Sequence, residues 1–432
     1  MILDLTINNF RSFKEENNFS MRAQRKIKEF DNNVKNVPNK VNNSIDVLKS
    51  AVIYGRNSSG KSNFLKALMA LQFMVHKSSS FEVDEEIAPY EPYLLDEKNV
   101  DQPVELTLDF IAKNNIQYTY RVVYNSKEFL HESLIFYPKL HHATLFLRNA
   151  GKPIKYGEYF TGSKKELEDK LYPNQLLLSK AGSNKIESLI EPYLFFKDSI
   201  MTSMFHDLEY DDLLIQTFTD KMVSGEVPHL VENISKLLDN ADTGIKGITV
   251  KEIDPEKFRF PDEIPEEDRK KIIDKYKYQI KTKHRFFKNG KEADYTLFSL
   301  NDESTGTIKL IALGGLILEA ISKGNVLVID EMDKSLHSKL TKSLVRLFHN
   351  PKTNPKGAQL IFATHDTNLM DNELYRRDQI WFIEKEYEGN SRLYALSDIE
   401  GVRKDVPFDK WYMSGKLGST PVINDLAFDF TL

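Results

Sequence analysis

Three short apolar runs dominate the hydrophobic pattern of this chain. Residues 47–54, 325–329 and 359–363 are mostly apolar, which is typical of strands that are buried on both faces of a parallel sheet. Segments 63–70 and 334–347 follow the first two runs after short polar loops, and both are rich in helix-forming residues. This order of strand, loop and helix predicts an α/β fold with a parallel sheet at its centre.

Between these runs, apolar and polar residues recur at other spacings. Apolar and polar residues alternate between turn residues and predict three antiparallel strands, at 104–110, 116–123 and 130–137. A helical period extends over about 164–238. Residues 278–300 form a predicted hairpin around the Asn-Gly pair at 289–290, because this pair favours tight turns. We interpret the adjacent phenylalanines 286–287 as core or partner-contact residues rather than as platforms for stacking bases.

The composition narrows the class of protein. At 432 residues the chain is long enough for two or three domains, and its net charge of −5 argues against a wholly basic nucleic-acid coat. The absence of cysteine excludes disulfides, thiolate metal sites and cysteine nucleophiles. The first residues lack the features of a signal peptide, and no window approaches the roughly 18 apolar residues of a membrane span. We therefore expect a cytoplasmic protein without membrane contact.

Residues 55–62 read Gly-Arg-Asn-Ser-Ser-Gly-Lys-Ser and fit the phosphate-binding pattern G-x-x-x-x-G-K-[ST] at every fixed position. Its glycines let the backbone fold around a polyphosphate, so that N–H groups and the positive end of the next helix face the charge. We expect Lys61 to reach the β- and γ-phosphates of ATP and Ser62 to bind Mg²⁺. The predicted contacts with the nucleotide are Gly55, Asn57, Ser58, Gly60, Lys61, Ser62 and Asn63.

Two adjacent carboxylates end the second apolar run. We predict that Asp330 holds Mg²⁺ at the carboxyl end of a parallel strand and that Glu331 polarises the attacking water as a general base. The alternative is an acidic pair at the N-terminus of the next helix, where carboxylates are also favoured. The phosphate-binding loop upstream favours the catalytic interpretation.

A histidine follows the third apolar run. A lone histidine after a strand is more often structural than catalytic. Here His365 comes after Asp330 and Glu331 in an order that favours a functional role. We expect it to contact the γ-phosphate or the attacking water.

The ordered set of motifs resembles a known family. Glycine loop, long insertion, serine-glycine helix, acidic strand end and strand-histidine occur in the same order in the ABC-type ATPase heads of chromosome-maintenance and recombination-repair proteins. The chain is similar above all to the AAA-fifteen type of bacterial ATPase from abortive-infection and restriction-linked loci. The segments that carry the resemblance are 9–13, 55–63, 303–307, 330–337, 364–367 and 377–385. The resemblance implies an ABC/SMC-like P-loop ATPase head with a β-rich lobe and a helical insertion.

The segment 302–309 opens a predicted apolar helix with Ser304 or Thr305 as its N-cap, and a serine-glycine turn at a helix N-terminus can also bind phosphate. By the resemblance, Ser304 and Gly306 would act on the nucleotide of a second subunit. The assembly would be a head-to-tail homodimer or a higher even-numbered oligomer, and Arg11 would lie near the nucleotide. The chain departs from the broader pattern at 305 and 307, both threonine, and at 337, a histidine.

Three segments follow from this comparison. An N-terminal ATPase lobe with the Walker A loop and the antiparallel strands is expected at 1–157. A helical insertion is expected at 158–245. A C-terminal ATPase lobe is expected at 246–432. It would contain the serine-glycine signature at 303–307, the Walker B strand that ends in Asp330 and Glu331, and His365.

The implied activity is Mg²⁺-dependent hydrolysis of ATP at the dimer interface. The implied role is control of a separately encoded effector, a nuclease or a toxin, in anti-phage defence by abortive infection. The alternative is a DNA-associated repair or maintenance ATPase. Nucleic acid therefore stays open as a partner.

Overall fold

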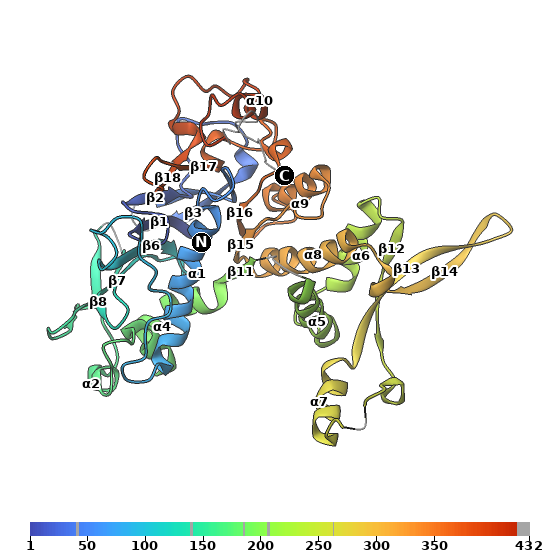
Figure 1. Ribbon diagram of the computed structural model, residues 1–432, viewed down its shortest axis with the longest axis horizontal. Coiled ribbons are helices and arrows are strands. Elements are labelled where there is room, and N and C mark those ends of the chain that lie inside the picture. The colour runs from blue at the N-terminus through green and yellow to red at the C-terminus, as the bar shows by residue number, and fades with distance from the viewer. Residues whose placement is uncertain (40–42, 139–140, 185, 205–207, 262, 421–432) are drawn as a thin grey trace, which may run out of the picture. The chain divides into compact units, whose positions relative to one another are not determined.

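The computed structural model describes residues 1–39, 43–138, 141–184, 186–204, 208–261 and 263–420. The chain forms two compact units. Unit 1 consists of residues 1–203, 324–332 and 345–432, and unit 2 consists of residues 204–323 and 333–344. Figure 1 shows the helices and strands of both units.

A six-stranded sheet forms the centre of unit 1, in the order β11-β15-β16-β5-β17-β18. Its strands are β5 (Ser50–Tyr54), β11 (Ile200–Met204), β15 (Val326–Asp330), β16 (Gln359–Ala363), β17 (Ile380–Lys385) and β18 (Ser391–Ala395). Strands β15, β16, β5 and β17 are parallel, and β18 is antiparallel to β17. Every residue of β5, β15 and β16 is buried, which confirms core strands in all three apolar runs, although residues 47–48 of the first run belong to β4 of a separate two-stranded sheet. Their carboxyl ends lie at one edge of the sheet, so the residues that follow them meet there.

An antiparallel sheet of seven strands forms the second sheet of unit 1, in the order β10-β9-β8-β7-β6-β1-β2. Its strands are β1 (Ile2–Asn8), β2 (Asn17–Ser20), β6 (Val104–Ile111), β7 (Gln117–Tyr124), β8 (Phe129–Phe136), β9 (Ala143–Asn149) and β10 (Lys155–Tyr156). Strands β6, β7 and β8 confirm the three predicted antiparallel strands. The ring of Phe19 in β2 lies 4.9 Å from the rings of Phe64 in helix α1 (Lys61–Lys77) and Trp381 in β17, which joins the two sheets.

Short elements complete unit 1. They are the hairpin β3 (Val34–Asn39) and β4 (Asn43–Leu48), and the helices α2 (Lys164–Glu168), α3 (Leu177–Ser183), α4 (Glu187–Leu194) and α10 (Phe408–Met413). The buried carboxylate of Glu132 in β8 accepts the backbone N–H groups of Leu177 and Leu178 at 2.7 and 2.9 Å, which anchors the start of α3 to the antiparallel sheet. The segment predicted as a helical insertion, 158–245, is thus divided: residues up to 203 belong to unit 1 and the later ones to unit 2.

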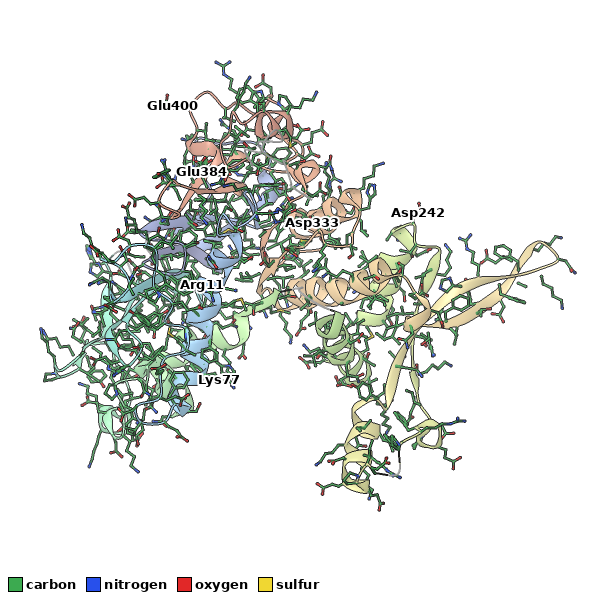
Figure 2. The ribbon with its side chains drawn as sticks, in the orientation of Figure 1. Arg11, Lys77, Asp242, Asp333, Glu384 and Glu400 are labelled. Atoms are coloured by element: carbon green, nitrogen blue, oxygen red, sulfur yellow. The ribbon has the colours of Figure 1, made fainter. Side chains whose placement is uncertain are left out.

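Unit 2 combines helices with a three-stranded antiparallel sheet in the order β12-β13-β14. Its elements are α5 (Leu208–Ser224), α6 (Leu230–Asn240), β12 (Ile245–Glu252), α7 (Glu266–Lys275), β13 (Tyr278–Lys288), β14 (Lys291–Ser299) and α8 (Thr305–Lys323). Helix α9 (Ser338–His349) begins in unit 2 and ends in unit 1. The predicted turn at 289–290 connects β13 and β14, and side chains project from both sides of this ribbon in Figure 2.

Helix α8 lies in the interior of unit 2. A Cβ on Gly315 would lie 2.6 Å from the ring of Phe218 in α5, and one on Gly314 would lie 2.7 Å from Leu237 in α6, so both neighbours pack directly on the backbone of α8. The helix has 19 residues and a mean hydropathy of 1.4, which is enough to cross a membrane by length and composition, but 72% of this window is buried inside the protein. The expectation that no stretch of the chain approaches a membrane span was wrong for α8, because a core helix needs the same apolar composition.

His349 predicts an acid-sensitive stability. Its Nε2 lies 2.8 Å from the hydroxyl of Ser50, the first residue of β5. Burial above all, together with the charges of Lys49 and Arg346, lowers the pKa of His349 from 6.5 to about 3. Between these values the unfolded chain binds a proton that the folded protein does not. Stability should therefore fall as the pH drops below 6.5, by up to about 1.4 kcal/mol per pH unit.

Urea unfolding of the wild type and a His349→Gln variant from about pH 7 to about pH 4 measures this effect. The glutamine keeps a polar group near Ser50 but does not titrate. The slope of the unfolding free energy against pH should therefore be smaller in the variant, by the amount that corresponds to uptake of about one proton on unfolding. Equal slopes for the two proteins would contradict the assignment to His349.

Candidate active site

One edge of the central sheet of unit 1 contains a cavity of about 860 Å³. Helix α1 begins there directly after the glycine loop, and β15 and β16 end there. The cavity is lined by loop residues 57–63, Asp330, Glu331, His365 and Arg11, among others. Folding therefore brings together the three predicted motifs that follow β5, β15 and β16.

The glycine loop forms a concave backbone surface at the start of α1. Lys61 Nζ donates to the carbonyl oxygens of Gly55 and Arg56, at 2.8 and 3.3 Å. Gly60 is the N-cap of α1 with a φ of 114°, a conformation that favours glycine. A Cβ at this position would also lie 2.6 Å from the hydroxyl of Ser12. The loop is thus a cradle that a larger residue would fill, at a helix N-terminus that favours anions.

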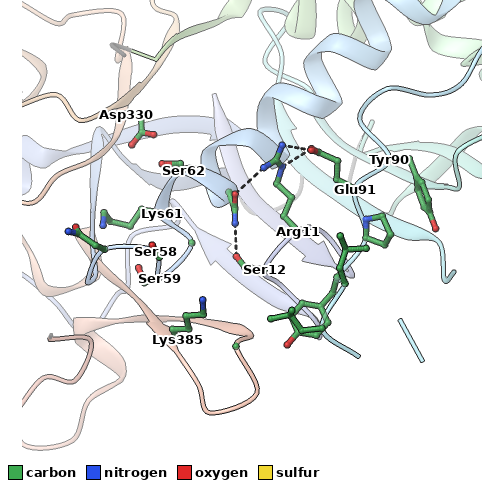
Figure 3. Close-up of a pocket in the computed structure, with 18 of the residues that line it drawn as sticks. Arg11, Ser12, Ser58, Ser59, Lys61, Ser62, Tyr90, Glu91, Asp330 and Lys385 are labelled. Atoms are coloured by element: carbon green, nitrogen blue, oxygen red, sulfur yellow. Dashed lines mark hydrogen bonds and ion pairs between the residues drawn. The ribbon is translucent and has the colours of Figure 1, made fainter. Parts of the chain in front are cut away.

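Asp330 is buried without a hydrogen-bond partner for one carboxylate oxygen. The residue is 2% exposed, and its Oδ2 bonds to none of the described residues. A buried polar oxygen in this state is costly, so it indicates a site for a ligand. Ser62 and Lys61 line the same cavity, as Figure 3 shows. Carboxylate and hydroxyl oxygens are ligands that Mg²⁺ prefers, so Asp330 and Ser62 fit this cation.

Glu331 lines the cavity beside Asp330, although successive strand residues point to opposite faces. It does so with a φ of 51°, a left-handed conformation that is uncommon for residues other than glycine. Helix α9 begins only at Ser338 and has no acidic residue in its first turn, which excludes the alternative of a helix N-terminal acid pair. His365 is exposed to the cavity beyond the end of β16.

Arg11 lines the cavity in an ion pair that the sequence did not suggest. Its Nε donates to Oε2 of Glu91 at 2.6 Å, and its Nη2 donates to Oε1. Its Nη1 lies 3.4 Å from Oδ1 of Asn63, and the amide of Asn63 donates to the hydroxyl of Ser12 at 2.9 Å. The segment after β1 thus supports the first turn of α1. Arg11 and Glu91 are 80 positions apart, and no local pattern relates them.

A comparison with protein families matches residues 50–371 to the family described as "AAA domain, putative AbiEii toxin, Type IV TA system". The match covers well over half of the chain and includes the glycine loop, Asp330, Glu331 and His365. The chain belongs to this AAA-domain family. The family match confirms the predicted AAA type of ATPase domain, and the largely parallel central sheet of unit 1 confirms the predicted α/β fold class.

Three solved structures similar to this AAA domain have low sequence identity. The SMC head bound to the C-winged helix domain of ScpA is 13% identical, with 91% of this chain and 97% of that chain covered and a TM-score of 0.47. The SMC head domain from Thermotoga maritima is 15% identical, with 91% of this chain and 98% of that chain covered and a TM-score of 0.39. The recombination mediator protein RecF with ATP is 14% identical, with 91% of this chain and 99% of that chain covered and a TM-score of 0.37. No curated protein matches the chain.

The predicted signature of this AAA domain lies at the start of α8. The Ser304 hydroxyl accepts the backbone N–H of Thr307 at 3.2 Å, as expected of an N-cap. A Cβ on Gly306 would lie 3.0 Å from the carbonyl oxygen of Ser335, so the backbone is close-packed here. Both signature residues belong to unit 2, whereas all residues that line the cavity belong to unit 1.

Sequence analysis missed one wall of the cavity in this AAA domain. Residues 90–95 form this wall, and Leu94 and Leu95 are each 67% exposed. The hydroxyl of Tyr93 donates to the carbonyl oxygen of Glu388 at 2.5 Å, which fixes the wall to the turn between β17 and β18. Such contacts join distant parts of the chain, so no motif announces them. Other lining residues that were missed include Ser12, Lys385 and Gly389.

Proposed function

We propose that this AAA domain binds ATP with Mg²⁺ in the cavity of unit 1 and hydrolyses it. The observation that carries the proposal is the buried Oδ2 of Asp330, which has no partner among the described residues and shares the cavity with Lys61 and Ser62. Membership of an ATPase family supports the choice of nucleotide.

Positioning and charge compensation account for most of phosphoryl-transfer catalysis. The loop N–H groups and Lys61 would bind the phosphates, and Ser62 and Asp330 would hold Mg²⁺. When bound, Mg²⁺ neutralises charge that develops on the β- and γ-phosphates. Glu331 would take a proton from the attacking water, and His365 would contact the γ-phosphate or that water. The water oxygen forms a bond to the γ-phosphorus as the bond between that phosphorus and its bridging oxygen breaks, and ADP and inorganic phosphate leave.

The proposal includes a second subunit. Ser304 and Gly306 of one subunit would contact the nucleotide in the cavity of another, in a head-to-tail homodimer or a higher even-numbered oligomer. One feature supports this arrangement. Ser304 caps an α-helix whose N-terminus favours anions.

Paired heterodimers test the shared site. One heterodimer combines a Lys61→Ala subunit with a Ser304→Arg subunit, so one of its two composite sites keeps both Lys61 and Ser304. We expect about half of the wild-type turnover per dimer, although each variant alone should be inactive. The matched control combines the double variant with the wild type, which damages both composite sites, and it should be inactive. An active control and an inactive first heterodimer would show that Ser304 acts on its own subunit's nucleotide and would contradict the proposal.

We further propose that ATP-dependent association controls a separately encoded effector, a nuclease or a toxin, in the cytoplasm of a bacterium under phage attack. The family description, which names a toxin system, supports this role. ATP that binds only the associated form stabilises it by mass action, and hydrolysis would end that stabilisation. Cells that carry the chain with its neighbouring genes should lose protection from phage when Lys61 is replaced by Ala. Unchanged plating of phage on the variant would contradict the defence role.

A further inference from the structure

The hairpin of β13 and β14 is a large part of unit 2 that the ATPase proposal does not use. Strand β12 pairs with β13 only between Tyr278 and His284, so residues 285–295 form a two-stranded ribbon. The ribbon extends beyond the end of β12 in Figure 1. All side chains of β14 from Lys291 to Phe298 are exposed. In the part of the chain that the structure describes, no other strand covers the outer half of this hairpin.

One face of the hairpin carries a row of cations. The opposite face is buried at its base, where the buried residues are Ile248, Ile280 and Thr282. Because successive strand residues alternate between faces, Lys281, Lys283 and Arg285 lie together on the face that is not buried. Their cross-strand partners are Ser299, Leu297 and Tyr295. Directly opposed residues share a face, so this face places cations next to apolar and aromatic side chains.

The hairpin is basic in an acidic chain. Residues 278–299 contain five lysines and arginines and two carboxylates, whereas the whole chain has a net charge of −5. Arg285 lies 3.6 Å from Glu292 in an ion pair that is about half exposed. The other cations, which have no ion-pair partner among the residues described, are Lys281, Lys283, Lys288 and Lys291. Uncompensated charge of one sign favours a polyanionic partner.

Exposed aromatic rings lie on both faces of the hairpin. Tyr295 is directly opposite Arg285 and Phe287 lies two residues beyond Arg285, so both share the cationic face, whereas Phe298 is opposite Thr282 on the other face. Phe286, Phe287, Tyr295 and Phe298 are 48%, 56%, 50% and 41% exposed. Of the two roles expected for Phe286 and Phe287, a place in the core is therefore excluded, and contact with a partner stays a prediction. Large exposed apolar side chains that gather in one place mark interaction sites. Aromatic rings beside cations are the combination that binds single strands, because bases stack on the rings while the phosphates meet the cations.

We propose that the β13–β14 hairpin binds single-stranded nucleic acid. Lys281, Lys283 and Arg285 contact the phosphates, and Phe287 and Tyr295 stack on bases. A duplex fits less well, because its bases are already stacked on one another. A protein partner fits less well, because the cationic face offers an apolar surface only between uncompensated charges, which are costly to bury.

The other face of the hairpin reaches the predicted signature. His284 Nε2 lies 2.7 Å from Oε1 of Glu303, and the hydroxyl of Thr282 donates to the same oxygen. Glu303 directly precedes Ser304, and β14 is separated from α8 by only a short turn. A bound nucleic-acid strand that restricts the motion of the hairpin therefore also restricts the motion of the residues next to Ser304. The binding itself does not depend on the ATPase proposal.

Fluorescence anisotropy with a labelled 20-nucleotide oligo(dT) strand and the full-length protein, without ATP, tests the proposal. Replacing both Lys281 and Lys283 with Gln should weaken binding at least tenfold. It should also reduce the slope of log affinity against log salt by about 1.4, because two phosphate contacts are lost. Replacing both Phe287 and Tyr295 with Ala should weaken binding by a similar factor or more but leave that slope unchanged. The matched control replaces Lys270 and Lys271 of the exposed helix α7 with Gln, and it should bind like the wild type.

Four outcomes would overturn the proposal. They are no binding of the strand by the wild type at low salt, equal weakening by the α7 control, tighter binding of a 20-bp duplex than of the strand, and a polyglutamate chain that competes as well as the strand does. The last outcome would indicate an acidic protein partner. Oligo(U) in parallel distinguishes RNA from DNA as the source of the strand. All substituted side chains are partly or fully exposed, and circular dichroism of each variant confirms that it is folded.

Discussion

Replacing Glu331 with Gln should lower the ATP turnover of this AAA domain by about two to four orders of magnitude, the usual contribution of a general base. Glutamine has nearly the same shape but cannot take a proton from water at neutral pH. Glu331 lines the cavity next to Asp330 and is held in a left-handed backbone conformation that turns it there. Because the phosphate contacts come from other residues, the affinity for ATP should change by no more than a few-fold.

Turnover and ATP affinity must be measured separately for this variant, by phosphate release at saturating ATP and by calorimetry. The matched control is Glu400→Gln, because Glu400 is exposed in the same unit and lies outside the cavity. It should behave like the wild type. Unchanged turnover of the Glu331 variant would remove this residue from the catalytic role. A parallel loss of affinity would instead assign it to nucleotide binding.

Replacing Asp330 with Asn should abolish Mg²⁺-dependent hydrolysis and at the same time stabilise the nucleotide-free protein. The substitution removes a carboxylate charge that would hold Mg²⁺, so turnover should fall at least a hundredfold, comparable to the loss of a major electrostatic contact. The same charge is buried with a free Oδ2 in the described part of the chain. A neutral amide is less costly to bury, so the free energy of unfolding should rise by about 1 kcal/mol.

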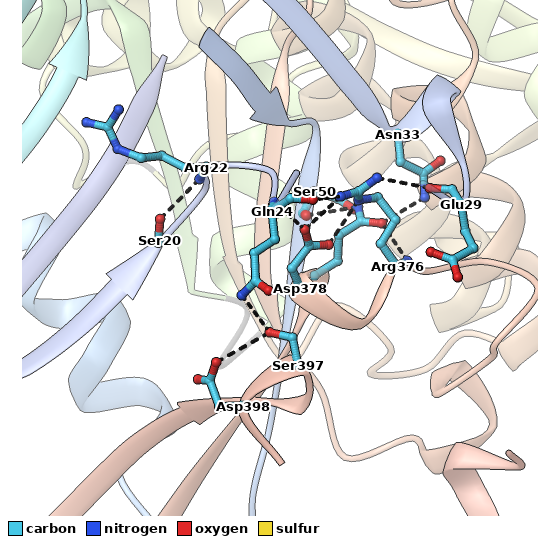
Figure 4. A network of polar contacts seen from close by, with 11 residues as sticks. Ser20, Arg22, Gln24, Glu29, Asn33, Ser50, Arg376, Asp378, Ser397 and Asp398 are labelled. Atoms are coloured by element: carbon cyan, nitrogen blue, oxygen red, sulfur yellow. Dashed lines mark hydrogen bonds and ion pairs between the residues drawn. The ribbon is translucent and has the colours of Figure 1, made fainter. Parts of the chain in front are cut away.

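Asp378 provides the matched control for this stability prediction. It is 3% exposed, almost as buried as Asp330, but both of its oxygens have partners. Arg376 donates to Oδ1 and Oδ2 at 2.9 and 2.8 Å, and the backbone N–H of Gln24 donates to Oδ2 at 2.8 Å, as Figure 4 shows. Asp378→Asn should destabilise the protein by about 3–5 kcal/mol, because it leaves a buried guanidinium without a counter-charge.

Urea unfolding of the two variants without nucleotide gives the comparison, and ATP titrations with Mg²⁺ or with a chelator give the functional part. The Asp330 variant should bind ATP equally well in both conditions, whereas the wild type should bind more tightly with Mg²⁺. If Asp330→Asn destabilised the protein as Asp378→Asn does, the free oxygen of Asp330 would have a structural partner, and the Mg²⁺ assignment would fail.

The central sheet and the three motifs could be predicted from the sequence because their signals are local. A strand buried on both faces shows a continuous apolar run, and the glycine loop requires fixed residues within eight positions. The parallel order of β5, β15 and β16 then fixes where Asp330 and His365 lie. The Asn-Gly turn of the hairpin is a local signal of the same kind.

The walls of the cavity could not be predicted, since each depends on a contact between distant segments. Glu91 faces Arg11 only because the segment after α1 returns past β1. The hydroxyl of Ser391 reaches the glycine loop through the carbonyl oxygen of Ser59, from a strand near the other end of the chain. Helix α9 begins at Ser338 rather than at 334, because residues 331–337 form turns instead. Helical composition alone does not reveal where a chain leaves the preceding strand.

The two glycines in the middle of α8 have a mechanical consequence. Phe218 and Leu237 lie directly on the helix backbone at Gly315 and Gly314, so at these two positions no side chain of α8 separates it from α5 and α6. Sliding of one helix past another would force a ring or a methyl group into main-chain atoms. We therefore expect a displacement of the Ser304 end of α8 to move α5 and α6 together with it as one rigid body, with little local repacking.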